Sequence, residues 1–185
     1  GTMPLSKTEM LEHVKKGSAA IIHSQKAIRK INYKGLLPVE IMGEANNSFL
    51  VIDQVTEFTK DLDFGFVRDH VKARKLNNAI SIVSADNGTD SLIASMGIEE
   101  GRVIYYGIPE ETADFKFTPY YPIFWNNVLR SLVESVKLKD LHFDTESTII
   151  LKRPLQIEKP DGKNYATSTL LADLAGIYKI GKGDE

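Results

Sequence analysis

The feature that most restricts the possible folds is a series of apolar segments joined by tight turns, within residues 78–136. The segments AISIVS and SLIASM are separated by Asn87-Gly88, a residue pair that favours a two-residue hairpin turn. A second turn, between Gly97 and Gly101, leads into the nearly continuous apolar segment RVIYYGI. This arrangement predicts a meander of strands, with the last segment, apolar on both faces, in the interior of the sheet.

A helix is predicted directly after this meander. The segment FTPYYP contains prolines and aromatic residues and cannot continue as regular helix, but proline is favoured at the first position of the helix that follows. Apolar residues then recur at spacings of three and four, and these are Ile123, Phe124, Val128, Leu132 and Val136. We expect this stripe to pack on the sheet.

The N-terminal third suggests an alternation of helices and strands. Ser6 and Glu9 have the spacing of a capping box, and Gly17 provides a stop, so a short amphipathic helix is expected between them. The segment SAAIIHS follows as a buried strand. We also expect a surface helix over residues 25–33, a polar turn over residues 44–48, and strands on either side of the charged loop 57–63.

The pattern changes near residue 137, where charged residues are followed by short strand-like segments only. The segment Pro160-Asp161-Gly162 between two alternating runs predicts a turn. We therefore predict an α/β domain over residues 1–138, with a mixed sheet flanked by helices, and a small β module over residues 139–185. The β module is expected to dock through the corner at residues 141–143.

Composition excludes several classes of function. A net charge of −2 and a pI near 6.1 give no overall attraction for nucleic acid. The chain has no cysteine, which removes thiol nucleophiles, disulfides and thiolate metal sites. No apolar run approaches the roughly 18 residues of a spanning helix, so we expect no direct membrane insertion by this segment.

Two polar segments are candidate sites. Asp61, Asp63, Asp69 and His70 are the nearest approach to a cluster of carboxylates and imidazole, but their spacing favours a solvated loop. The loop at residues 86–90 holds oxygen ligands of the kind that bind Ca²⁺, yet a hairpin turn explains it better. We predict no metal and no cofactor.

Three segments, VKKGSAAII, GRVIYYGI and FTPYYPIFWNNVLRSL, resemble the amidotransferase-like α/β region of prokaryotic aerotolerance-type (BatA-like) membrane proteins, which are associated with von Willebrand type A domains. The tail TIILKRPLQIEKPDGKNYATSTLLADLAGIYKI is similar to the short β module that often follows this region. The resemblance implies a class I glutamine amidotransferase-like fold. The Asp-x-Ser-x-Ser metal motif of the type A domain is absent from the sequence.

Amidotransferase activity is excluded on chemistry, because its mechanism requires a cysteine nucleophile and a His-x-Glu pair. The resemblance then implies a degenerate, non-catalytic scaffold with protein partners, the soluble part of a prokaryotic protein tethered to the cytoplasmic membrane through segments outside this chain. We predict no catalytic residue and an interaction surface formed by Tyr120, Tyr121, Trp125, Pro38 and Glu40. Two alternatives stay open: a carbohydrate-binding module, and a hydrolase that uses the loop from Asp61 to His70.

Overall fold

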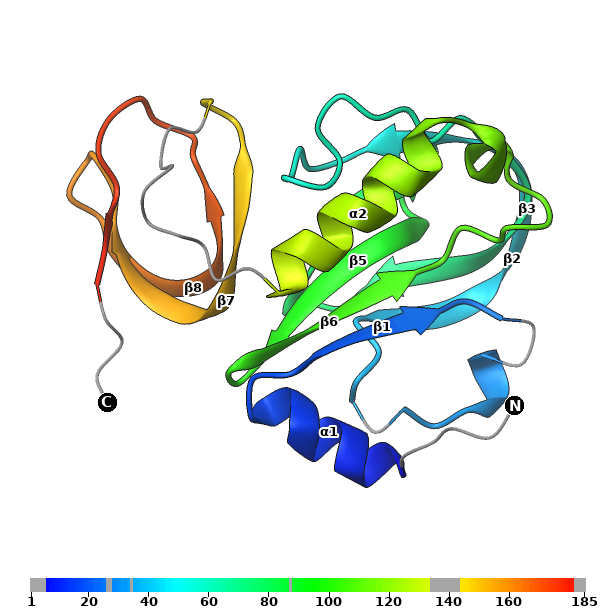
Figure 1. Cartoon of the computed structure of the whole chain (residues 1–185), viewed down its shortest axis with the longest axis horizontal. Coiled ribbons are helices and arrows are strands. Elements are labelled where there is room, and N and C mark those ends of the chain that lie inside the picture. Colours follow the sequence, from blue (N-terminus) through cyan, green and yellow to red (C-terminus); the bar gives the residue numbers. More distant parts are fainter. Residues whose placement is uncertain (1–5, 26–27, 34, 87, 134–143, 182–185) are drawn as a thin grey trace.

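The computed structural model describes residues 6–25, 28–33, 35–86, 88–133 and 144–181 (Figure 1). Its helical elements are α1 (Lys7–Lys15), η1 (Ile28–Lys30), η2 (Asp114–Phe117) and α2 (Tyr120–Val133). Its strands are β1 (Ala19–His23), β2 (Val39–Ile52), β3 (Phe66–Lys75), β4 (Ala79–Ala85), β5 (Ser91–Ile98), β6 (Gly101–Tyr106), β7 (Thr148–Glu158), β8 (Asn164–Leu171) and β9 (Lys179–Ile180).

The main sheet has six strands in the order β1-β6-β5-β4-β2-β3. β1 and β6 are parallel, and every other pairing in this sheet is antiparallel. The predicted meander is confirmed, because β4, β5 and β6 pair consecutively and β6 lies inside the sheet. The sheet curls, so that β3 also approaches β5.

The predicted α/β, amidotransferase-like fold class is wrong. The chain is mostly β, with a curled six-stranded sheet, a second sheet and two α-helices in the part of the chain that the structure describes. Among the described residues of the predicted helix over 25–33, only the single turn of η1 is helical, and the predicted turn over residues 44–48 lies inside β2. β2 continues through this polar stretch because Asn46 and Ser48 pair with β3, although Asn47 between them takes a left-handed conformation (φ 58°), which asparagine tolerates better than most residues. The middle third is therefore a long β2–β3 ribbon without a crossover helix.

Both faces of the main sheet are covered. On one face α2 packs over a core that includes Ile104, Tyr106 and Phe124. On the other face α1 and the segment at residues 28–36 pack over Val103 and Tyr105 (Figure 1). α1 sits so close to β6 that a Cβ on Gly101 would lie 1.9 Å from the backbone oxygen of Val14, so only glycine fits at this position.

β7, β8 and β9 form a second sheet, in the order β8-β7-β9. Two of the short segments after residue 137, TIILK and LQIEK, form one continuous strand, β7, whose register with β8 shifts between Ile150 and Leu155. Ile150 belongs to the core of the main sheet, and Arg102 Nη2 donates a hydrogen bond of 2.6 Å to the Leu151 carbonyl. The predicted boundary at 138/139 and the predicted docking corner at residues 141–143 lie outside the described residues. Among the helices that the structure describes, none has the length and apolar character needed to cross a membrane.

Candidate functional site

Strand β1 forms one edge of the main sheet and, among the strands that the structure describes, pairs only with β6. Arg102 N donates to Ser18 O, and Ser24 N donates to Tyr106 O, so the even-numbered residues turn their backbone groups toward β6. Because backbone groups alternate along a strand, the N–H and C=O of Ala19, Ile21 and His23 point away from the sheet. These groups present a hydrogen-bonding edge.

The opposite edge of the sheet, at β3, is protected. Arg68 N donates to Thr112 O at 3.0 Å, Thr112 Oγ1 donates to Asp69 O at 2.9 Å, and Val67 forms a β-bridge with Ala113. β3 also carries exposed charged residues, which discourage strand pairing: Arg68, Asp69, Lys72, Arg74 and Lys75. β1 contains no Lys, Arg, Asp or Glu. The two edges therefore differ in chemistry, and β1 lacks the usual protection.

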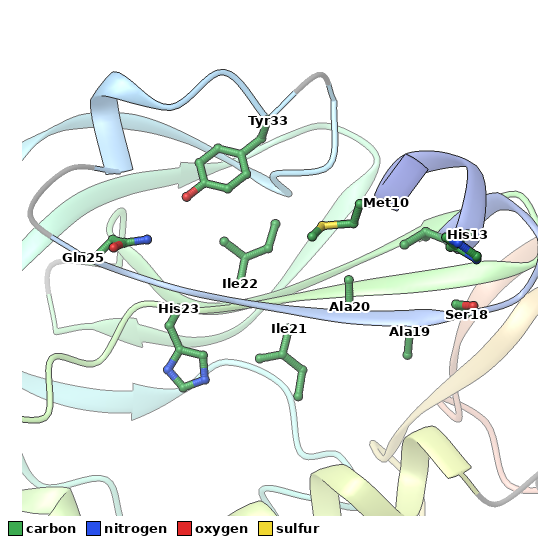
Figure 2. Close-up of a pocket in the computed structure, with 11 residues that line it drawn as sticks. Met10, His13, Ser18, Ala19, Ala20, Ile21, Ile22, His23, Gln25 and Tyr33 are labelled. Carbon is green, nitrogen blue, oxygen red and sulfur yellow. The ribbon is translucent and has the colours of Figure 1, made fainter. Parts of the chain in front are cut away.

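An open groove with a volume of about 560 Å³ runs along β1. We call it the edge groove. Figure 2 shows Met10, Ile22 and Tyr33 on one side of β1, and Ile21 and His23 on the other. The groove therefore flanks the free backbone edge with apolar side chains on both faces of the sheet.

At the carboxyl end of β1 the groove meets a cluster of rings. The imidazole of His23 stacks on Trp125, with centroids 5.2 Å apart and planes at 11°, and lies 5.1 Å from the ring of Tyr106. Desolvation by these neighbours lowers the pKa of His23, while the charge of Glu110 opposes that effect. These contacts therefore favour the neutral form of the His23 imidazole at neutral pH.

Glu110 lies beside this cluster and is already engaged. Its carboxylate accepts hydrogen bonds from the Tyr121 hydroxyl and, at 2.9 Å, from Lys116 Nζ. These hydrogen bonds, the one from Tyr121 first, lower the pKa of Glu110. The arrangement ties the start of α2 to the segment that follows β6.

The structure places the predicted surface residues in two separate groups. Tyr120, Tyr121 and Trp125 are partly buried against the core under α2. Pro38 is buried and Glu40 is exposed, and both lie at the start of β2. Their neighbour Val39 packs in the core on the face of the sheet that α1 covers, not on the face under α2. Two of these residues contact the cluster around His23 and Glu110: the Tyr121 hydroxyl donates to the Glu110 carboxylate, and the Trp125 ring stacks on His23.

The Asp61 to His70 loop does not gather into a site. Asp61, Asp63 and Asp69 are exposed, whereas His70 is buried and has Asp90 as its carboxylate neighbour, with Nε2 and Oδ2 3.5 Å apart. Adjacent residues on a strand point to opposite faces, so Asp69 and His70 in β3 diverge. Within the described ranges, no group of three or more His, Asp or Glu residues could hold a metal ion.

The loop at residues 86–90 is a hairpin connection, as predicted. Gly88 N donates to Ala85 O, and Ala85 N donates to Asp90 O, both at 2.8 Å. Gly88 has a φ of 69°, which the turn requires.

Sequence reasoning missed His23, Glu110 and Tyr33 as site residues. His23 and Tyr33 lie in the first third of the sequence and Glu110 follows β6, so their relation depends on the parallel pairing of β1 with β6. The aromatic residues around Trp125 were the one local sequence signal that indicated a site at the carboxyl end of β1.

Comparison with known proteins places the chain in a family. A model of a domain of unknown function, DUF7408, matches residues 5–128, more than half of the 185-residue chain. The chain belongs to the DUF7408 family. The matched region of this DUF7408 member includes the edge groove and most of α2, and it ends before the second sheet. No curated protein matches the sequence.

Solved structures share the fold of this DUF7408 member at low identity. A cytoplasmic protein from Salmonella typhimurium LT2 matches with a TM-score of 0.59 and 14% identity, over 71% of this chain and 62% of that chain. A second cytoplasmic protein from Salmonella typhimurium gives a TM-score of 0.60 with the same identity and coverage. A β-galactosidase from Rahnella sp. R3 gives a TM-score of 0.52 at 8% identity, over 71% of this chain and 21% of that enzyme. Each match covers less than two thirds of the other protein, and at these identities the likeness concerns the fold alone.

Proposed function

We propose that this chain is a non-catalytic protein-interaction domain that binds an extended segment of a partner protein by strand addition to β1. In this mode, main-chain hydrogen bonds supply affinity and the flanking pockets supply specificity. The observation that carries the proposal is the outward-facing backbone of Ala19, Ile21 and His23 beside the edge groove.

The contrast between the two edges of the sheet supports this proposal. An unprotected edge strand favours aggregation, and natural sheets protect such edges with charges, bulges or a covering segment. β3 has both charges and a covering segment at Thr112 and Ala113, whereas β1 has neither a charged residue nor a second partner among the described strands. A bound segment of a partner protein would pair with β1 and so protect this edge of the sheet.

The side chains around the edge groove support binding over catalysis. The Glu110 carboxylate is engaged by Tyr121 and Lys116, and the His23 ring is stacked on Trp125. The Trp125 ring also contacts Phe124 and Tyr121. A carbohydrate-binding platform needs an aromatic ring whose face is open to the sugar, and the Trp125 ring is packed against other rings. This packing favours a peptide that binds beside the ring cluster over a sugar that stacks on it.

The proposed association with the cytoplasmic membrane rests only on the resemblance to von Willebrand type A-associated proteins. It requires segments outside this chain. Fractionation of the source cells, with an antibody against this domain, tests it: the natural protein is expected in the membrane fraction and to be released by detergent but not by high salt.

Strand addition is tested by selecting binders from a yeast-displayed library of random nine-residue peptides. Selected peptides are expected to slow hydrogen exchange at the N–H groups of Ala19, Ile21 and His23, measured by NMR on ¹⁵N-labelled protein. The variant Ile21→Pro lacks one of these donors but leaves the bonds to β6 in place, so it should lose binding. Ile21→Val is the matched control and should retain binding.

A library that yields no binders would overturn the proposal, as would binders that leave these amides unprotected. If Ile21→Pro does not fold, peptides N-methylated at alternate positions replace it. Methylation at the positions that donate to β1 should abolish binding, and methylation at the others should not.

A further inference from the structure

Two tyrosine hydroxyls at the carboxyl end of β1 are buried without a hydrogen-bond partner among the described residues. They belong to Tyr33 and Tyr105, whose side chains are 5% and 0% exposed. A buried hydroxyl that gives up its hydrogen bonds to water costs on the order of 1–3 kcal/mol. Such a cost is unusual in a native core and calls for a physical reason.

Tyr33 lines the edge groove, and its hydroxyl points toward Gln25, which follows the end of β1 at His23 (Figure 2). Tyr105, on β6, belongs to the same buried cluster as Tyr33. The Tyr105 ring folds back over Gly107, where a Cβ would lie 2.6 Å from Cε1 of the ring. The absence of a side chain at Gly107 therefore allows the Tyr105 hydroxyl to lie at this end of the sheet.

The two hydroxyls are protonated at neutral pH. Burial raises the pKa of Tyr33, and burial raises the pKa of Tyr105 to about 12, with a further contribution from Tyr33. The side chains of Gln25 and Ser24 act in the opposite direction on the pKa values of Tyr33 and Tyr105, respectively, although by geometry neither hydroxyl has a hydrogen-bond partner among the described residues. Both hydroxyls are thus neutral donors.

Resting on the proposed function, we propose that Tyr33 and Tyr105 form a polar subsite of the edge groove that binds the side-chain amide of an Asn or Gln residue in the partner segment. The amide oxygen accepts from the phenol hydroxyl of Tyr33, and the amide nitrogen donates to the side-chain oxygen of Gln25 or Ser24. The Tyr105 hydroxyl, in the same buried cluster, is the second polar group of the subsite.

A neutral amide fits this subsite better than a charged group. The side chains placed around the two hydroxyls, Ser24 and Gln25, are uncharged, and Gly107 adds none. Burial of a carboxylate or an ammonium group without a counter-charge costs several kcal/mol, far more than burial of a hydrogen-bonded amide. A purely apolar residue would leave the hydroxyls unsatisfied.

The stability of Tyr33→Phe gives a first readout. Removing a hydroxyl that has no partner should leave the free energy of unfolding of the unbound protein unchanged or raise it. A tyrosine with a structural hydrogen bond would instead lose stability on this substitution. Urea denaturation of the two proteins measures the difference, and a clear loss of stability in Tyr33→Phe overturns the inference.

Specificity is tested with the displayed nine-residue library, applied to the wild type and to Tyr33→Phe. Wild-type binders are expected to be enriched in Asn or Gln at one position, and an enriched peptide should bind Tyr33→Phe about 3- to 10-fold more weakly, the range that corresponds to one neutral hydrogen bond. Changing that Asn or Gln to Leu should weaken binding to the wild type more than it weakens binding to Tyr33→Phe, because the variant has already lost the hydrogen bond from Tyr33. Tyr165→Phe, in β8 of the second sheet, is the control and should bind like the wild type.

The outcomes separate the two proposals. Peptides that protect the β1 amides but show no enrichment of Asn or Gln, and bind Tyr33→Phe as tightly as the wild type, overturn the amide subsite and leave strand addition standing. Peptides whose binding does not depend on the β1 edge overturn strand addition, and the subsite with it.

Discussion

At the scale of single residues, His23 shows how packing sets charge. Its ring stacks on Trp125 and contacts Tyr106, and the resulting desolvation disfavours the imidazolium form and lowers the pKa below the ordinary value of 6.5. The unfolded chain keeps the ordinary pKa, so it binds a proton at a higher pH than the folded protein does. The contribution of His23 to stability is therefore complete above about pH 6.5 and falls as the pH drops below it.

This linkage predicts a pH-dependent difference between the wild type and His23→Phe, a variant that keeps an aromatic ring against Trp125 but cannot be protonated. The free energy of unfolding of the wild type should fall relative to that of the variant when the pH is lowered from 7.5 to 5.5. Urea denaturation at both pH values, followed by the fluorescence of the single Trp, measures it. The other titrating groups are common to both proteins and cancel in the comparison. A difference that is the same at both pH values would show that the stack does not perturb His23.

At the scale of elements, the parts predictable from sequence are those whose signals are local. The helix at the N-terminus follows from a capping box that forms as expected: Glu9 N donates to Ser6 Oγ at 3.2 Å, and Ser6 N donates to Glu9 Oε2 at 2.8 Å. The meander follows from its turns. The β2–β3 ribbon could not be predicted in the same way, because its polar centre at Asn47 looks like a turn and becomes strand only through pairing with β3.

The candidate site was partly predictable for the same reason. Tyr121 and Trp125 stand out locally as aromatic residues at the start of a helix. The open edge of β1 depends on which strands pair, and β1 pairs with β6, a strand far away in the sequence. The apolar segment AAII also suggested a strand buried on both faces, as in one layer of an α/β fold. In β1, however, Ile22 is the one buried residue, and the connection from β1 leads into the antiparallel ribbon.

Arg102 is the residue that most directly joins the two sheets. It is buried on β6, its Nη2 donates to the Leu151 carbonyl on β7, and desolvation lowers its pKa while the charge of Glu57 acts in the opposite direction. Arg102→Met keeps much of the apolar stem but leaves the Leu151 carbonyl without this donor. A hydrogen bond from a charged group is worth about 1.5–3 kcal/mol, so the variant should lose stability by about that amount.

Hydrogen exchange gives the location of this effect. In Arg102→Met, exchange should accelerate in β7 and β8 more than in β4 and β5, because the lost bond holds the second sheet to the first. Arg68→Met, at an exposed position on β3, is the matched control and should change neither the free energy of unfolding nor the exchange rates in β7 and β8. Uniform acceleration across both sheets would mean that Arg102 stabilises the main sheet instead of the contact between sheets.

At the scale of the whole molecule, the two sheets differ in the size of their cores. The main sheet has one extensive cluster under each face, whereas the buried cluster of the second sheet consists of Leu151, Ile157 and Leu170. β7 also contributes Ile150 to the core of the main sheet. A small sheet of three strands is marginal in isolation, so the second sheet depends on the first for its stability.

This dependence predicts an asymmetry between fragments. Residues 144–181, expressed alone, should give the circular dichroism and narrow amide NMR dispersion of an unfolded chain. Residues 1–143 should stay folded, because both main clusters remain, but with a lower free energy of unfolding, since burying a side chain such as Ile150 contributes about 1.5–3 kcal/mol. If the contacts of Ile150 and Arg102 hold the two sheets together without a covalent link, adding residues 1–143 should restore the dispersion of the amide NMR signals of residues 144–181. Dispersed NMR signals from residues 144–181 alone would show that the second sheet folds independently, and its contacts with β6 would then join two autonomous units.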